Sequence, residues 1–275
     1  MLSLLGRTLV VVAHPDDETG GCGLLLQRIS QPLVLFATNG APDDRWFWSS
    51  FGSKQDYAAV RRAEACAAME CAGVRHVEFI ADDYPACTDQ HLFHVLPVAM
   101  QAIAAAMVKY EPEVLLAPAY EGGHPDHDAC SFLCNVLGRH FGIPVWEMPL
   151  YHRIPDGRLV CQEFIEPDGS EFTLYPTEAE SARKAEMLAC YKSQAGLDNF
   201  VTKRSEQFRR QPDYDYASPP HPGMLNYEAW QWPIRGSELC SAFASCVSDQ
   251  ARARHTRRPI PYLDPHEAHK VAAGD

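Results

Sequence analysis

The sequence predicts an α/β fold in which a mostly parallel sheet carries helices on both faces, with an antiparallel addition at one edge and a C-terminal extension. Short apolar runs alternate with longer segments of helical pattern as far as residue 148, which is the order of a parallel sheet. Two of these runs, residues 8–13 and 114–119, are followed by clusters of histidine and aspartate. Ligands of open α/β sheets bind at the carboxyl ends of the strands, so we expect both clusters to belong to one functional site.

Five apolar segments are expected to form the strands of the sheet. They are short and bounded by turn or polar residues, as buried strands are. The expected strands cover residues 8–13, 33–38, 77–81, 113–119 and 144–148. Residues 158–174 alternate polar and apolar side chains around Asp-Gly turns, which indicates the antiparallel addition.

The helices are expected between these strands, and two of them carry clear end signals. Gly73 ends the second helix as a C-cap glycine, and Thr177 with Glu180 forms the capping box of the last one. The expected helices cover about residues 21–30, 54–72, 90–110, 128–141 and 177–192. The sequence therefore predicts a Rossmann-like arrangement.

A single domain is expected over residues 1–248, with its core at residues 5–200 and a C-terminal elaboration at residues 201–248. Residues 218–233 of that elaboration are rich in proline and aromatic residues. From residue 249 onward the chain is polar, basic and proline-containing, so we expect residues 249–275 to form a loosely ordered tail.

The composition narrows the class of protein. A chain of 275 residues with 46% hydrophobic residues can bury a large core. The net charge of −12 argues against a nucleic-acid partner, and no stretch is long and apolar enough to span a membrane. The first residues lack the basic region of a secretory signal, and the ten cysteines have no regular spacing. We therefore expect a cytoplasmic protein, and a homo-oligomer is compatible with the sequence.

The two polar clusters have the composition of a metal centre. The first is His-Pro-Asp-Asp-Glu at residues 14–18, and the second is His-Pro-Asp-His at residues 124–127. Imidazoles and carboxylates bind divalent metals, and two imidazoles with one carboxylate and an open position are a catalytic zinc set. We expect His14, Asp17 and His127 to be the ligands.

The same two motifs, AHPDDE and HPDH, resemble the signatures of the LmbE-like, or PIG-L, N-acetylglucosaminyl deacetylases. The resemblance covers roughly residues 5–200 and extends to Arg61-x-x-Glu64 and to Tyr191-Lys192-Ser193-Gln194. It implies a catalytic domain that binds one Zn²⁺ per chain and hydrolyses a linear amide C–N bond. Another divalent metal is compatible with the same ligands.

The resemblance also separates the roles of the two neighbouring aspartates. It gives the metal to Asp17 and the role of base to Asp16, which would take a proton from the attacking water. His124 suits the protonation of the leaving amine or the stabilisation of the oxyanion. We expect Asp126 to hold that imidazole and to raise its pKa. Some relatives carry a tyrosine two residues before the second motif, where this chain has Gly122.

Three residues are candidates for contact with the substrate. Arg61 matches the arginine that the resemblance implies for this purpose, and its alternative is a solvated surface position. Trp46 and Trp48 follow the second strand and are able to stack on a sugar or lipid or to cover the site as a lid. Packing within their own loop or in an oligomer contact is the alternative for both tryptophans.

Rival enzyme classes lack their motifs. The first turn has no G-x-G-x-x-G, and its three carboxylates would repel a pyrophosphate. Neither a Walker lysine nor a G-x-S-x-G elbow is present. The sequence thus indicates a zinc-dependent de-N-acetylase for a small molecule that contains an N-acetylglucosaminyl group. An amidase for a larger N-acyl amino-sugar conjugate and a non-catalytic metal- or sugar-binding protein remain the alternatives.

Overall fold

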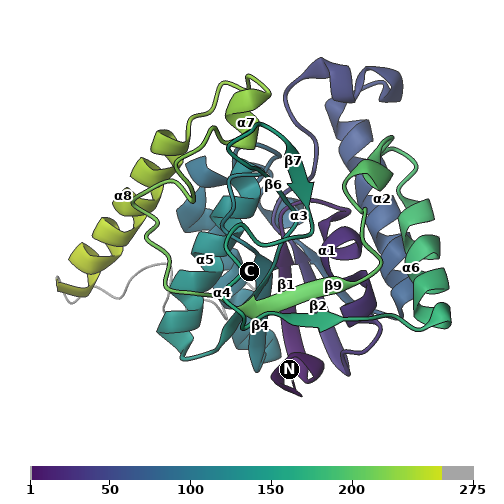
Figure 1. Ribbon diagram of the computed structural model, residues 1–275. Coiled ribbons are helices and arrows are strands. Elements are labelled where there is room, and N and C mark those ends of the chain that lie inside the picture. The colour runs from purple at the N-terminus through teal and green to yellow at the C-terminus, as the bar shows by residue number, and fades with distance from the viewer. Residues whose placement is uncertain (1, 256–275) are drawn as a thin grey trace.

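The computed structural model describes residues 2–255, and its centre is a seven-stranded sheet in the order β3-β2-β1-β4-β5-β9-β8 (Figure 1). Five strands are parallel and lie in the N-terminal part of the chain: β1 (Arg7–Val12), β2 (Gln31–Phe36), β3 (His76–Phe79), β4 (Val114–Pro118) and β5 (Val145–Met148). The antiparallel strands β9 (Glu206–Arg210) and β8 (Phe172–Leu174) extend the sheet beyond β5. The mostly parallel sheet and its antiparallel addition confirm the predicted fold class.

Helices cover both faces of the sheet (Figure 1). One face carries α1 (Asp17–Leu26), α2 (Lys54–Ala72) and α6 (Glu178–Cys190), and the other carries α4 (Leu96–Tyr110), α5 (Pro125–Phe141) and α8 (Gly236–His255). Side chains of a strand alternate between the faces, so Leu9 and Val11 of β1 pack with α4 and α5, while Val10 and Val12 pack with α1 and α2. The core therefore consists of two apolar layers, one on each side of the sheet.

The strand order reverses between β1 and β4, which is where such sheets leave a crevice. β1 pairs with β2 on one side and with β4 on the other. The helix that follows β1 covers one face, and the helix that follows β4 covers the opposite face. The two polar motifs therefore begin on either side of this crevice.

Several elements differ from the sequence prediction. Helices α1 and α5 begin at Asp17 and Pro125, earlier than expected, so each motif already contains the first turn of a helix. Helix α4 begins only at Leu96, because Asp126 accepts hydrogen bonds from the backbone N–H groups of Gln90 and Leu92 and holds that segment as a loop. The sequence analysis missed strand β9 and helix α8.

The remaining elements lie at the carboxyl ends of the strands or between them. A two-stranded antiparallel sheet of β6 (Tyr151–Arg153) and β7 (Leu159–Cys161) follows β5. Short helices are α3 (Ile80–Asp83) and α7 (Asn226–Ala229), and single 3₁₀ turns cover Leu2–Leu5, Arg45–Phe47, Ser49–Phe51, Leu92–His94 and Leu197–Asn199. In the described part of the chain, no helix combines the length and apolarity needed to cross a membrane.

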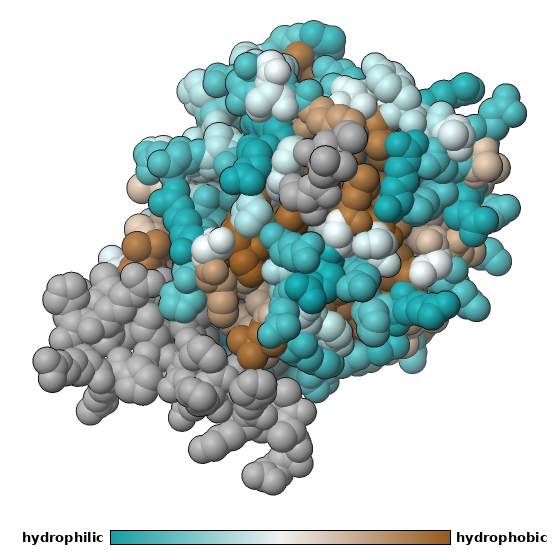
Figure 2. Space-filling view, turned by 90° about the horizontal axis from the view of Figure 1, so that it is seen from below, coloured by the Kyte–Doolittle hydropathy of each residue, from teal (hydrophilic) through white to brown (hydrophobic). Residues whose placement is uncertain are grey.

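The two ends of the sheet differ in what they expose. The lower end, seen in Figure 2, shows apolar side chains among hydrophilic ones, and a cavity of about 620 Å³ lined by residues such as Arg7, Gln31 and His76 opens there. None of the predicted site residues lines that cavity. Of the predicted tail, residues 249–255 lie in α8, and residues 256–275 lie outside the described residues.

Candidate active site

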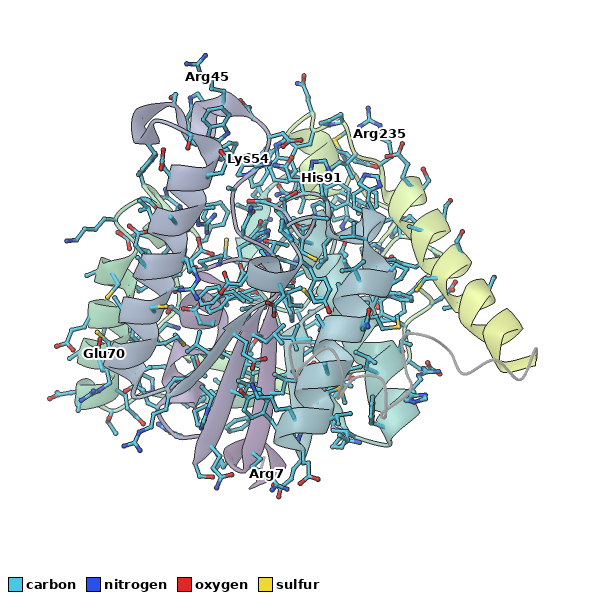
Figure 3. All side chains as sticks on the ribbon, turned by 180° about the vertical axis from the view of Figure 1, so that it is seen from behind. Arg7, Arg45, Lys54, Glu70, His91 and Arg235 are labelled. Carbon is cyan, nitrogen blue, oxygen red and sulfur yellow. The ribbon has the colours of Figure 1, made fainter. Side chains whose placement is uncertain are left out.

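A second cavity of about 600 Å³ opens at the carboxyl ends of β1 and β4. Its lining includes His14, Asp16, Asp17 and His124, which come from both sequence motifs. Figure 3 shows that Arg7, the first residue of β1, lies at the end of the molecule opposite to Arg45 and Arg235. The motifs that the sequence places on two strand ends thus share one cavity, as expected.

Asp17 lies between two imidazoles on the floor of this cavity. Its Oδ2 is 3.4 Å from Nδ1 of His14, and its Oδ1 is 3.1 Å from Nε2 of His127. Oδ2 also accepts a hydrogen bond of 2.7 Å from the backbone N–H of His14. All three side chains are buried. Burial alone would raise the pKa of Asp17, but His127 and His14 hold it well below its usual range.

This group fits a metal ion better than it fits internal hydrogen bonding. Both ring nitrogens of His127 are buried; among the described residues Nδ1 has no hydrogen-bond partner, and Nε2 faces Oδ1 of Asp17. Buried polar atoms are rarely left without a partner, and an unpaired imidazole nitrogen beside a carboxylate oxygen is the donor set of a zinc ligand group. A buried His/Asp metal-binding group is therefore present.

Among the described residues, two groups have ligand atoms that all lie within 4.8 Å of one another, and neither group includes Asp17. The first is formed by ring nitrogens of His14, His124 and His127, and the second by ligand atoms of His14, Asp89, His124 and Asp126. His124 is thus an alternative to Asp17 as the third ligand. Asp17 contacts the imidazoles of both His14 and His127. A His124 bound to the metal could not also carry a proton to the leaving group.

Asp16 has a strained backbone and an unusual carboxyl group. Its φ of 129° is in a region that L residues rarely adopt, and such strain gathers at functional sites. Arg61 fixes the turn, since its guanidinium donates to the carbonyl oxygens of Gly40 and Pro15 and, over 2.8 Å, to Oδ2 of Asp16. Burial raises the pKa of Asp16 to about 7, with Arg61 opposing the shift and Asp17 adding to it.

The two shorter motifs, residues 61–64 and 191–194, make contacts with this turn or with each other. Glu18 accepts a hydrogen bond of 3.0 Å from the backbone N–H of Asp16 and a further bond from the hydroxyl of Tyr191 at the end of α6. Glu64 accepts hydrogen bonds from the backbone N–H and hydroxyl of Ser193. Glu64 therefore joins α2 to the end of α6. It does not pair with Arg61, although the two residues are close in the sequence.

Asp126 holds His124 through its backbone and not through the expected carboxylate–imidazole pair. The carboxylate of Asp126 is 3.1 Å from Nε2 of His14 and binds two backbone N–H groups, whereas it is 3.9 Å from Nδ1 of His124. The contact with His124 is made by the backbone N–H of Asp126, which donates to Nδ1. Burial, followed by the charge of His14, lowers the pKa of His124 and outweighs Asp126, which raises that pKa as expected.

Asp89 is a site residue that the sequence analysis missed. Its Oδ1 is 3.3 Å from Nε2 of His124 and 3.4 Å from Nε2 of His14, and it has no hydrogen bond in the described structure. Because Nδ1 of His124 accepts a hydrogen bond, a neutral His124 carries its proton on Nε2, toward Asp89. The available signal was the position of Asp89 after β3, whose carboxyl end faces the same edge as β1.

The three predicted substrate contacts have different surroundings. Arg61 lines the cavity but is buried and committed to the turn that carries Asp16. Trp46 is 77% exposed at the rim of the cavity. Trp48 is not part of the lining, and its Nε1 donates to the carbonyl oxygen of Pro42 within its own loop.

Aromatic residues from later segments complete the rim. Trp230 and Trp232 line the cavity with Phe200 and Tyr151, and the Trp230 and Trp232 ring centroids are 5.2 Å apart. Burial, followed by the charges of Asp17 and Asp16, raises the pKa of Tyr151 well above its ordinary value, so its hydroxyl stays protonated. The opening is therefore bordered by aromatic rings from segments on both sides of the fold.

Fold and site together define an α/β enzyme with a buried His/Asp metal-binding group at the switch point of its sheet. The family model described as PIG-L, GlcNAc-PI de-N-acetylase, matches residues 9–136, which carry both motifs. None of the curated proteins matches the chain by sequence. The match to this family model covers residues 9–136 and agrees with the resemblance carried by the two motifs.

Solved structures show the same fold at low sequence identity. The A40926 pseudoaglycone deacetylase Dbv21 has a TM-score of 0.57 and 20% identity over 74% of this chain and 96% of its own. The zinc-inhibited form of teicoplanin deacetylase Orf2 has a TM-score of 0.57 and 18% identity over 76% and 100%. The 4-carboxy-2-hydroxymuconate hydratase GalB from Pseudomonas putida has a TM-score of 0.53 and 18% identity over 76% and 98%. These likenesses show the fold, which also carries a hydratase.

Proposed function

We propose that this protein is a zinc-dependent de-N-acetylase that removes the acetyl group from a small molecule containing an N-acetylglucosaminyl group. The observation that carries the proposal is the gathering of His14, Asp16, Asp17 and His124 in the lining of one cavity, with His127 in contact with Asp17. In the reaction the C–N bond of the amide breaks, the oxygen of water joins the acyl carbon, and acetate and a free amine leave.

The metal is assigned to His14, Asp17 and His127. A divalent ion there would polarise the amide carbonyl as a Lewis acid and lower the pKa of water. The carboxylate of Asp126 lies 3.1 Å from Nε2 of His14, the kind of contact that orients a metal-binding imidazole through its other nitrogen. Two imidazoles and one carboxylate favour zinc, although other divalent ions bind such sets.

Asp16 is assigned the role of general base. A base is most effective when its pKa lies near the working pH, and burial places that of Asp16 at about 7. Arg61 and Glu18 hold its side chain and its backbone, so the carboxylate keeps one orientation toward the cavity.

His124 is assigned the role of general acid for the leaving amine. Its Nε2 faces the cavity side occupied by Asp89, and its Nδ1 is fixed by the backbone of Asp126. An amine leaving group is too basic to depart without a proton, and Nε2 is the atom from which His124 would supply it. Asp89 favours the protonated imidazole against the effect of burial.

The substrate assignment rests on the shape and lining of the cavity. A volume of about 600 Å³ accommodates a sugar with part of an aglycone, since small-molecule sites range from about 300 to 1,000 Å³. Asp89 offers an acceptor for sugar hydroxyls, and the aromatic rim offers faces for stacking. The same rim also suits a larger N-acyl group, which keeps an amidase for such conjugates as the second candidate. A cytoplasmic location and a homo-oligomer remain predictions.

The test is release of acetate from a panel of N-acetylated amino sugars by protein loaded with zinc. Turnover that requires the metal and is lost in Asp16→Asn would support the proposal. Release of longer acids from N-acyl analogues, without release of acetate, would favour the amidase. Zinc and sugar binding without turnover of any amide would identify a non-catalytic binding protein and contradict both enzymes.

A further inference from the structure

Tyr151, the first residue of β6, has a hydroxyl group whose role neither motif explains. Its ring contacts those of His127, Phe200 and Trp230, with centroid distances of 5.3, 5.0 and 6.1 Å. The side chain lines the cavity, yet its hydroxyl is part of none of the hydrogen bonds among the described residues. The phenol is thus packed on three sides while its polar end remains available to a ligand.

We propose that the Tyr151 hydroxyl donates a hydrogen bond to the carbonyl oxygen of the amide that this enzyme cleaves. The inference rests on the proposed function and adds a catalytic residue to it. Negative charge develops on that oxygen as water attacks, and a donor already in place stabilises the charge without reorganising. Contact of the ring with His127, a proposed metal ligand, puts Tyr151 beside the position where the carbonyl would be polarised.

The loop before the second motif is built to hold Tyr151 there. Oε1 of Glu121 accepts hydrogen bonds of 2.7 and 2.8 Å from the backbone N–H groups of Leu150 and Tyr151. A Cβ atom at Gly123 would lie 1.9 Å from the carbonyl oxygen of Tyr151 and 3.0 Å from its Cδ2. Glycine at residue 123 is therefore required for β6 to approach the HPDH turn, and Glu121 fixes the approach.

The neighbouring residue 122 cannot supply such a hydroxyl itself. A Cβ atom at Gly122 would lie 2.6 Å from Cδ2 of Leu225, and the φ of Gly122 is +67°. A tyrosine at this position would therefore need both a strained backbone and a displaced Leu225. Among the other cationic or phenolic donors of the cavity, Arg61 is committed to Asp16 and to two carbonyl oxygens. The Tyr151 hydroxyl, by contrast, makes no hydrogen bond with the described residues.

The decisive variant is Tyr151→Phe, which keeps the ring and its packing and removes only the hydroxyl. We expect kcat for acetate release to fall about 10²-fold with KM little changed, as for the loss of one oxyanion donor. Tyr110→Phe, which removes a hydroxyl bonded to Glu78 on another part of the molecule, is the matched control. Metal content and Tm should be the same in the three proteins.

A change of one substrate atom tests the contact directly. Replacing the acetyl oxygen by sulfur weakens the hydrogen bond that it accepts, so the ratio of the oxygen to the sulfur rate should be larger in the wild type than in Tyr151→Phe. Equal ratios, or an unchanged kcat in the variant, would overturn the inference while the deacetylase proposal stood.

A binding measurement separates this inference from the proposed function. Acetohydroxamate chelates metals and presents an oxygen in place of the acetyl carbonyl, and calorimetry with zinc-loaded protein measures its affinity. Weaker binding by Tyr151→Phe than by Tyr110→Phe is expected even if no amide in the panel is cleaved. Equal affinities would remove the hydroxyl from the site. Failure of the wild type to cleave any amide would count against the proposed function alone.

Discussion

Nη2 of Arg61 donates a hydrogen bond of 2.8 Å to Oδ2 of Asp16. The same guanidinium also donates to the carbonyl oxygens of Gly40 and Pro15. The arginine therefore acts on the proposed base itself, through charge and through position. Burial raises the pKa of Asp16 and Arg61 lowers it, so the value of about 7 is a balance between the two.

Removal of this charge should move the limb of the pH profile that Asp16 sets. Without Arg61 the protonated form of Asp16 is favoured, its pKa rises, and the deprotonated base appears only at higher pH. We expect Arg61→Met to shift this limb of kcat/KM upward and Arg61→Lys to shift it less. Arg62→Met, which loses an exposed ion pair with Asp82 and a cation–π contact with Phe79 away from the cavity, is the control. An unmoved limb in Arg61→Met would separate Asp16 from that limb.

Loss of the base should leave the metal in place. We expect Asp16→Asn to keep its zinc and to lose about 10²–10⁴-fold in turnover. Metal analysis with initial rates checks this, and Asp82→Asn on the surface serves for comparison. A zinc-loaded Asp16→Asn protein with an ordinary rate would exclude the assigned role.

Metal stoichiometry distinguishes the two possible ligand sets. If His14, Asp17 and His127 are the ligands, then His127→Ala and Asp17→Ala should bind much less than one zinc per chain, whereas His124→Ala should bind it normally. His76→Ala, at an exposed position of β3, controls for surface binding. Equal loss in His124→Ala, with zinc retained in Asp17→Ala, would favour the three-imidazole set.

A second limb of the profile should report His124. Burial, followed by the charge of His14, lowers the pKa of His124, while Asp89 raises it, so the acid loses its proton at a lower pH than a solvated histidine would. Removal of the carboxylate in Asp89→Asn should move the His124 limb to still lower pH. His124→Ala, with its metal confirmed, should flatten that limb. If neither variant alters this limb, it belongs to another group.

The two tryptophans of the loop after β2 should differ in effect, since Trp46 lines the cavity and Trp48 does not. We expect Trp46→Ala to raise KM for substrates with a large aglycone and to spare a minimal N-acetyl sugar. Trp48→Ala should instead lower Tm, because Trp48 is bonded to Pro42 inside the loop. Steady-state kinetics with both substrates decides, and equal losses for both in Trp46→Ala would make that residue structural.

The sequence by itself determined the fold class and the location of the site. Strand periodicity and the C-cap at Gly73 are local signals, and they predicted the parallel sheet and the end of α2. The two motifs predicted that His14, Asp17 and His127 lie together because each motif follows a buried strand, and parallel strands end at the same edge; the three side chains are in contact. Strand β9 escaped because Glu206 and Arg209 are polar residues that are buried by pairing with Lys184 and Glu147.

Only the tertiary structure decided what each polar residue contacts. The spacing of Asp126 and His124 suggested a direct carboxylate–imidazole pair, but the first turn of α5 presents a backbone N–H to His124 and turns the carboxylate toward His14. Asp89 and Tyr151 reach the cavity from segments far from the motifs in sequence. Asp126 holds the first segment through the backbone N–H of Gln90, and Glu121 holds the second through that of Tyr151. Hydrogen-bond direction and burial depend on how distant segments pack, and sequence spacing carries no record of either.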